Sequence, residues 1–417
     1  MATDRARKFF EKLGDLIKQR WRRKNCDDAH FSEIALGALR KMPPAGQLEE
    51  SDLVGWLLSA QNLPRQELGT QPPFTLYHHP LFKVGAFFWL HDEHTPIHQH
   101  CVSGALHQFS GATLHFLYRF KQRERINSRL LIGDLTLRSA ECLQPGDSRA
   151  IEHGSRTIHA TFHLHRPTVT IVIQTHLDKE TLPQYSYLKP SLAYDPVAEN
   201  ALLTRQLELL KVLREAGNTA AYRHFKERIS RADFEETFLL LRDGQIFLRP
   251  DHLQRLLAVA RKRHGRRADL FGPVFEEMRR REMITTRSHF AAKPEHALLL
   301  GLLLHLPDRQ SICDFIARHV GRDPVRTIVA WVREMAAETP NALGIRFDDL
   351  SIEVFQLLLR GASFREVLRQ LKKRYPATAV EAEEAQLREL CGAFAESALF
   401  KPLFRRPAKM RAGVATA

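Results

Sequence analysis

The residues of this 417-residue chain whose types and spacing could do chemistry are histidines, of which there are 21. His98 and His100 are separated by one residue, and side chains two positions apart on a strand share a face. At a rise of roughly 3.3 Å per residue their backbones lie about 7 Å apart, so both imidazoles can converge on one ion. The pair therefore predicts a metal site.

A third ligand is expected from a later strand. Polar and apolar residues alternate from Thr157 to Leu164, and the apolar face must pack against a core, which leaves the histidine face to line the interior of a barrel. His159 and His163 share that face, but they lie about 13 Å apart along the strand, too far for both to bind one metal. His153 is the main alternative to His159.

The segment from His98 to Gly111, HQHCVSGALHQFSG, resembles the first motif of the cupin superfamily. In that motif, two histidines one residue apart are followed by a glutamate and then by a glycine. Gly104 stands at the position of the glutamate, and Gly111 at that of the final glycine. Pro145 and Gly146 supply a turn like that of the second cupin motif. The resemblance implies a small β-barrel, or jelly roll, in this part of the chain.

Cupins that lack the glutamate include the cysteine dioxygenase, thiol oxygenase and gentisate dioxygenase group, which hold iron(II) on three neutral histidines. The segment from Gly154 to His159 resembles the approach to the third ligand in such cupins, which makes His159 the predicted ligand and His163 a pocket residue. The resemblance therefore implies Fe(II) on His98, His100 and His159, with zinc, manganese and nickel as the alternative metals. Three neutral ligands leave the ion its full +2 charge and about three open positions. The implied enzyme is an oxidoreductase, a dioxygenase or oxidase that acts on O2 and a small-molecule or peptide thiol or a related chelating substrate.

The alternative function is a non-catalytic cupin that senses a small ligand or a metal. In that case the basic helical domain would bind nucleic acid or a protein partner. A barrel that holds no metal after purification would favour this alternative.

Strand parity predicts the roles of the neighbouring residues. Gly104, like His100, is an even number of positions from His98 and should face the metal. His107 and His115 are an odd number of positions from His98 and should face away. His107 and His115 are therefore expected to be hydrogen-bonded core residues. Cys101 is expected to be a buried, inert thiol.

The elements that must position the histidines are strands. Short β-rich runs divided by Gly, Pro and Asp predict a barrel, with strands over residues 74–77, 84–90, 113–120, 130–137, 157–164 and 168–175.

The segments on both sides of these strands are predicted to be helical. Apolar residues recur at spacings of three and four from Phe9 to Trp21. Asp323 precedes a proline at the start of another helix, and Ser363 begins a helix that is expected to run to Tyr375.

The predicted fold class is therefore α+β, with a small cupin-type β-barrel (jelly roll) between two helical parts. We expect three regions. They are a helical N-terminal segment at 1–72, a cupin-like barrel with the metal site at 73–185, and an all-helical C-terminal domain at 186–417.

Composition limits the remaining functions. The net charge is +14. Its basic runs are expected to be solvated faces or to contact an acidic or peptide partner, and they lie at 18–24, at 261–267 together with 279–281, and at 401–411. The five cysteines form no CxxC pair, so reduced thiols are expected. The sequence shows no span for a membrane and no leader pattern, which predicts a cytoplasmic protein without a membrane partner. Phosphate loops, nucleophile elbows and HExxH motifs are absent from the sequence.

Overall fold

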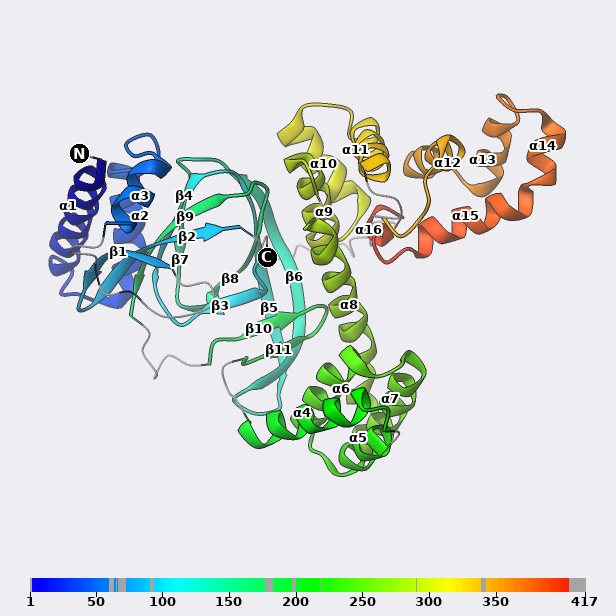
Figure 1. The fold of residues 1–417 in the computed structure, drawn as a ribbon, viewed down its shortest axis with the longest axis horizontal. Helices are drawn as coiled ribbons and strands as arrows, with labels where there is room; N and C mark the ends of the chain where they lie inside the picture. The colour runs from blue at the N-terminus through cyan, green and yellow to red at the C-terminus, as the bar shows by residue number, and fades with distance from the viewer. Residues whose placement is uncertain are drawn as a thin grey trace, which may run out of the picture. The chain divides into compact units, whose positions relative to one another are not determined.

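The computed structural model describes residues 2–59, 64, 66, 73–90, 94–176, 183–196, 200–218, 220–289, 291–338 and 343–404 (Figure 1). The chain forms two compact units. Unit 1 holds Met1–Thr161 and Arg166–Arg279, and unit 2 holds Phe162–His165 and Arg280–Ala417. The main division therefore falls between residues 279 and 280, whereas the sequence predicted a boundary between residues 185 and 186.

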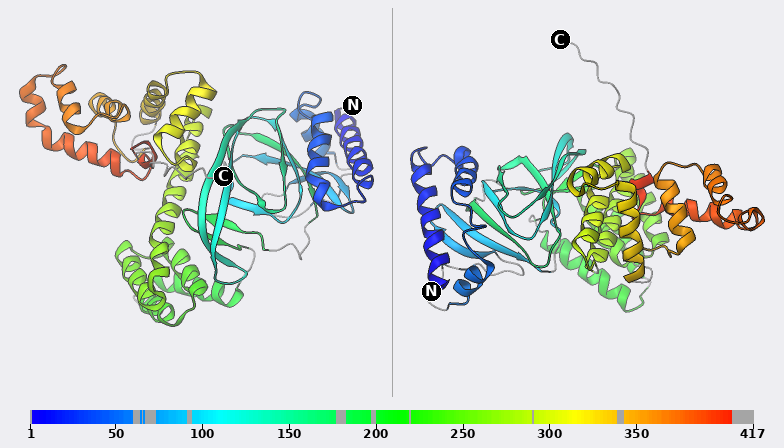
Figure 2. Two further views of the ribbon diagram at one scale, coloured as in Figure 1. Left: turned by 180° about the vertical axis from the view of Figure 1, so that it is seen from behind. Right: turned by 90° about the horizontal axis from the view of Figure 1, so that it is seen from above.

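The N-terminal helices of unit 1 pack on a β-sheet. Helix α1 (Ala2–Arg22) buries Phe10, Leu13 and Ile17, which recur at spacings of three and four as predicted. These side chains share one apolar core with sheet residues such as Phe82 and Ile171. Figures 1 and 2 show the helices beside this sheet, with α2 at Phe31–Lys41 and α3 at Glu50–Leu57.

This sheet has five strands in the order β1-β2-β9-β4-β7, and its pairings are antiparallel. Its strands are β1 (Phe74–His79), β2 (Phe82–Trp89), β4 (Gly104–Ser110), β7 (Ser148–Ile151) and β9 (Thr168–Thr175). The central strands β9 and β4 are mostly buried because the N-terminal helices cover one face.

The other six strands close into a barrel in the order β10-β11-β6-β5-β8-β3, and the pairing of β10 with β3 completes the ring. The mixed class with a barrel between helical parts is thus confirmed. Strands β10 and β11, of three residues each, were not predicted, because so short a run shows no alternation. The strands are β3 (Ile97–His100), β5 (Thr113–Arg125), β6 (Leu130–Leu143), β8 (Gly154–His163), β10 (Ser186–Leu188) and β11 (Leu192–Tyr194).

Four helices that follow the barrel share a core with two of its strands. Leu130 and Ile132 of β6 and Leu192 of β11 belong to the same apolar cluster as buried phenylalanines of these helices. Arg129 also donates to Glu235 at 2.7 Å. The helices therefore belong to the barrel unit. They are α4 (Ala201–Glu215), α5 (Ala220–Arg231), α6 (Phe234–Phe247) and α7 (Pro250–His264).

Unit 2 consists mainly of helices. The side chain of Asp323 accepts a hydrogen bond from the Arg326 N–H at 2.7 Å, so the predicted cap is present. Helix α13 ends at Leu371, four residues before the predicted Tyr375. Within the described residues, no helix is long and apolar enough to cross a membrane. The helices from the link between the units onward are α8 (Phe271–Ser288), α9 (Pro294–His305), α10 (Arg309–Val320), α11 (Pro324–Glu338), α12 (Asp349–Leu359), α13 (Phe364–Leu371), α14 (Ala377–Ala382), α15 (Glu384–Glu396) and α16 (Lys401–Phe404).

Candidate metal centre

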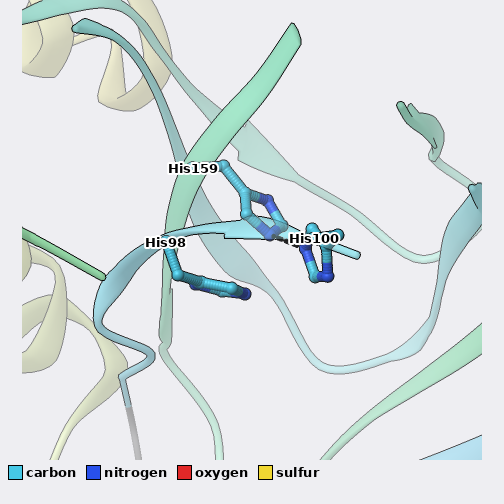
Figure 3. A group of neighbouring side chains, drawn as sticks. All are labelled: His98, His100 and His159. Carbon is cyan, nitrogen blue, oxygen red and sulfur yellow. Dashed lines mark hydrogen bonds between the residues drawn. The ribbon is translucent and has the colours of Figure 1, made fainter. Parts of the chain in front are cut away.

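The three histidines predicted as ligands lie together inside the barrel unit (Figure 3). Each offers a ring nitrogen, and these nitrogens lie within 4.8 Å of one another. His98 of β3 pairs directly with His159 of the neighbouring strand β8, so the two side chains project on one face. A register shift follows between His98 and His100. The Nε2 atoms of His100 and His159 are 2.8 Å apart.

One pair of these nitrogens has the spacing expected of two ligands of a divalent transition-metal ion. Ligands at right angles around an ion, each at about 2.1 Å from it, lie about 3 Å apart. The distance between His100 and His159 matches that spacing. His98 forms a hydrogen bond of 2.8 Å between its Nδ1 and the Pro96 carbonyl. Because a carbonyl only accepts, the proton is on Nδ1, and Nε2 of His98 keeps its lone pair for a metal.

The electrostatics of the cluster favour neutral rings. Burial lowers the pKa of both His100 and His159 well below the usual 6.5, and the neighbouring imidazoles act in the same direction. A neutral imidazole is the form that binds a metal. Among the described residues, the cluster contains His159 and not its alternative, His153.

The prediction that His115 faces away from this site is wrong. Its Nε2 lies 2.9 Å from Nδ1 of His159, and its side chain is 2% exposed. The parity count failed because β3 ends at His100 and the chain crosses to the other sheet before β4 begins. Strand β5 then returns to the barrel as the neighbour of β8. Alternation within one strand carries no information across such a crossing.

The prediction that Gly104 faces the metal is also wrong. Gly104 begins β4 in the five-stranded sheet, where it pairs with Ile151 on one side and Gln174 on the other. A Cβ atom at this position would lie 1.9 Å from the carbonyl oxygen of Ile173. The glycine therefore permits a close approach between two backbones, and it does not mark a vacated ligand position.

His107 has the structural role that was predicted for it. The Ala45 N–H donates to its Nε2 at 3.2 Å, and its Nδ1 donates to the Ser148 hydroxyl at 2.9 Å. Burial lowers the pKa of His107 to about 4, although the Asp147 carboxylate acts in the opposite direction. Cys101 is buried, as expected for an inert thiol, and His163 is buried near the end of β8.

The lowered pKa of His107 predicts a loss of stability in acid. Between pH 6.5 and pH 4 the unfolded chain takes up a proton that the folded chain does not, so the free energy of unfolding decreases as the pH falls. The contribution of His107 across this window is about 3 kcal/mol. His107→Gln keeps a donor and an acceptor but does not titrate. The free energy of unfolding, measured by urea unfolding at several pH values, should therefore depend less steeply on pH in the variant. Identical slopes would contradict the prediction.

Comparison with known proteins assigns this chain to no family. The sequence matches no family model and no curated protein. The barrel with its three histidines is consistent with a cupin-like fold. The function is therefore inferred from the site.

Proposed function

We propose that this protein is a cupin-like, mononuclear non-haem iron(II) dioxygenase or oxidase. The substrate is a small-molecule or peptide thiol or a related chelating compound. The observation that carries the proposal is the convergence of three imidazoles, from His98, His100 and His159, with no carboxylate in the metal-ligand cluster within the described part of the chain.

The chain's own residues would hold the ion, and they keep the ligand rings in the form that binds a metal. His98 presents Nε2 because its Nδ1 is bonded to a backbone carbonyl, and burial keeps His100 and His159 neutral. When bound, iron(II) on three neutral ligands would accept O2 and a chelating substrate side by side. Oxidation of a thiol R–SH by O2 to the sulfinic acid R–SO2H balances without another reactant.

Zinc on three histidines is a known hydrolytic arrangement, so the identity of the metal decides between classes of reaction. Manganese and nickel also accept imidazole ligands. A barrel that binds no metal would instead favour the sensor function.

The test is metal analysis followed by anaerobic loading with iron(II). We expect about one iron per chain and O2 uptake when a small thiol such as cysteine is added, with the sulfinic acid as the product. His98→Ala should abolish both, whereas His224→Ala, at a half-exposed position on α5, should change neither. Stoichiometric zinc without O2 uptake, or no metal after loading, would overturn the proposal.

A further inference from the structure

We infer that Glu141 and His115 form a positioning relay that fixes the ring orientation and proton position of His159. The inference rests on the metal centre proposed above. The relay crosses three neighbouring strands, from Glu141 on β6 through His115 on β5 to His159 on β8. Two hydrogen bonds of 2.9 Å join them, one between His115 Nδ1 and Glu141 Oε1 and one between His159 Nδ1 and His115 Nε2.

The relay begins at a carboxylate that stays ionised. Arg149 donates from Nη2 to Glu141 Oε2 at 2.6 Å and from Nε to Oε1 at 3.0 Å. Burial raises the pKa of Glu141, but the hydrogen bonds and charges of His115 and Arg149 outweigh it and lower this pKa to about 2. Glu141 therefore acts only as an acceptor at any pH at which the protein would work.

The direction of each hydrogen bond follows from this acceptor. His115 must donate from Nδ1 to Glu141, so with a single proton on its ring the Nε2 atom accepts. His159 then donates from Nδ1 to His115. The lone pair of His159 is left on Nε2, the atom that lies 2.8 Å from Nε2 of His100. The relay thus aims the ligand nitrogen at the proposed ion.

Burial makes the relay effective. The side chains of His115 and His159 are 2% and 4% exposed, so water competes little for their ring nitrogens. A hydrogen bond in such surroundings is stronger than in water. By accepting the Nδ1–H of His159, His115 makes the metal-binding Nε2 of that ring more basic and so a better ligand. Because Arg149 offsets the charge of Glu141, the main effect on the metal is orientation and proton position.

The first experiment removes the middle of the relay from the full-length chain. Cobalt(II) affinity is measured by competitive titration, and proton NMR of the cobalt protein detects the exchangeable Nδ1–H of His159. We expect His115→Phe to weaken cobalt binding about 10–100-fold and to abolish the slowly exchanging His159 signal. His115→Gln, which can accept from His159 and donate to Glu141, should restore much of both. His107→Phe, at a buried histidine of the other sheet, should change neither.

The second experiment changes Glu141, at the end of the relay away from the metal. Because this side chain is partly exposed, its substitution should perturb the fold less than that of the buried His115. Glu141→Leu leaves His115 without its acceptor and should weaken cobalt binding, whereas Glu141→Gln keeps an acceptor oxygen and should lie closer to the wild type. If His115→Phe does not fold, the comparison of Glu141→Leu with Glu141→Gln tests the relay instead. Wild-type affinity and an unchanged His159 signal in His115→Phe or Glu141→Leu would overturn the relay. A wild-type protein that binds neither cobalt nor iron would instead refute the proposed metal centre.

Discussion

Replacing His98 or His159 with alanine is expected to lower metal affinity by more than about 100-fold. This exceeds the 10–100-fold cost of losing a residue that only supports a ligand, because each variant loses one of three donors. The measurement is elemental analysis of the loaded protein together with a competitive titration. His98→Ala should perturb the fold less than His159→Ala, because His98 is only partly buried whereas His159 is buried.

The fold should survive these substitutions, because the apolar strand faces and the packed helices stabilise unit 1. Circular dichroism and thermal unfolding of His98→Ala should therefore resemble those of the wild type. His224→Ala is the control for the loss of an imidazole elsewhere. Stoichiometric iron in a folded His98→Ala, His159→Ala double variant would place the metal site elsewhere.

Gly104→Ala is expected to destabilise the protein by more than about 3 kcal/mol, toward the severe end for overpacking. The added methyl group would lie 1.9 Å from the Ile173 carbonyl oxygen, which belongs to the backbone of β9. This atom cannot move aside as a flexible side chain would, because β9 is paired on both sides. Low soluble yield and a lower midpoint of thermal unfolding are the observable results.

The matched control is Gly272→Ala in α8. A Cβ atom there meets no atom of the described residues within 4 Å, and alanine favours a helix over glycine by about 1 kcal/mol. The control should therefore be neutral or slightly stabilising. If Gly104→Ala were as stable as the wild type, the close approach of β4 and β9 would not hold.

Local pattern was enough to predict many elements of the fold. The spacing of Phe10, Leu13 and Ile17 predicted the buried face of α1, and Asp323 correctly marked the start of α11. The alternation around His159 predicted β8, and the spacing of His98 and His100 predicted a shared site. Each of these inferences depends on residues within a few positions of one another, where the period of the backbone determines which side chains share a face.

The sequence by itself thus determined many of the segments that form helices and strands, and which histidines could converge. Only the tertiary structure decided that His115 contacts His159, that Glu141 completes a relay, and that Gly104 lies in the other sheet. These relations depend on which strands become neighbours, and strand pairing is set by packing over the whole chain. The period of two that orients side chains within a strand ends where the chain leaves one sheet for another, as it does between His100 and Gly104.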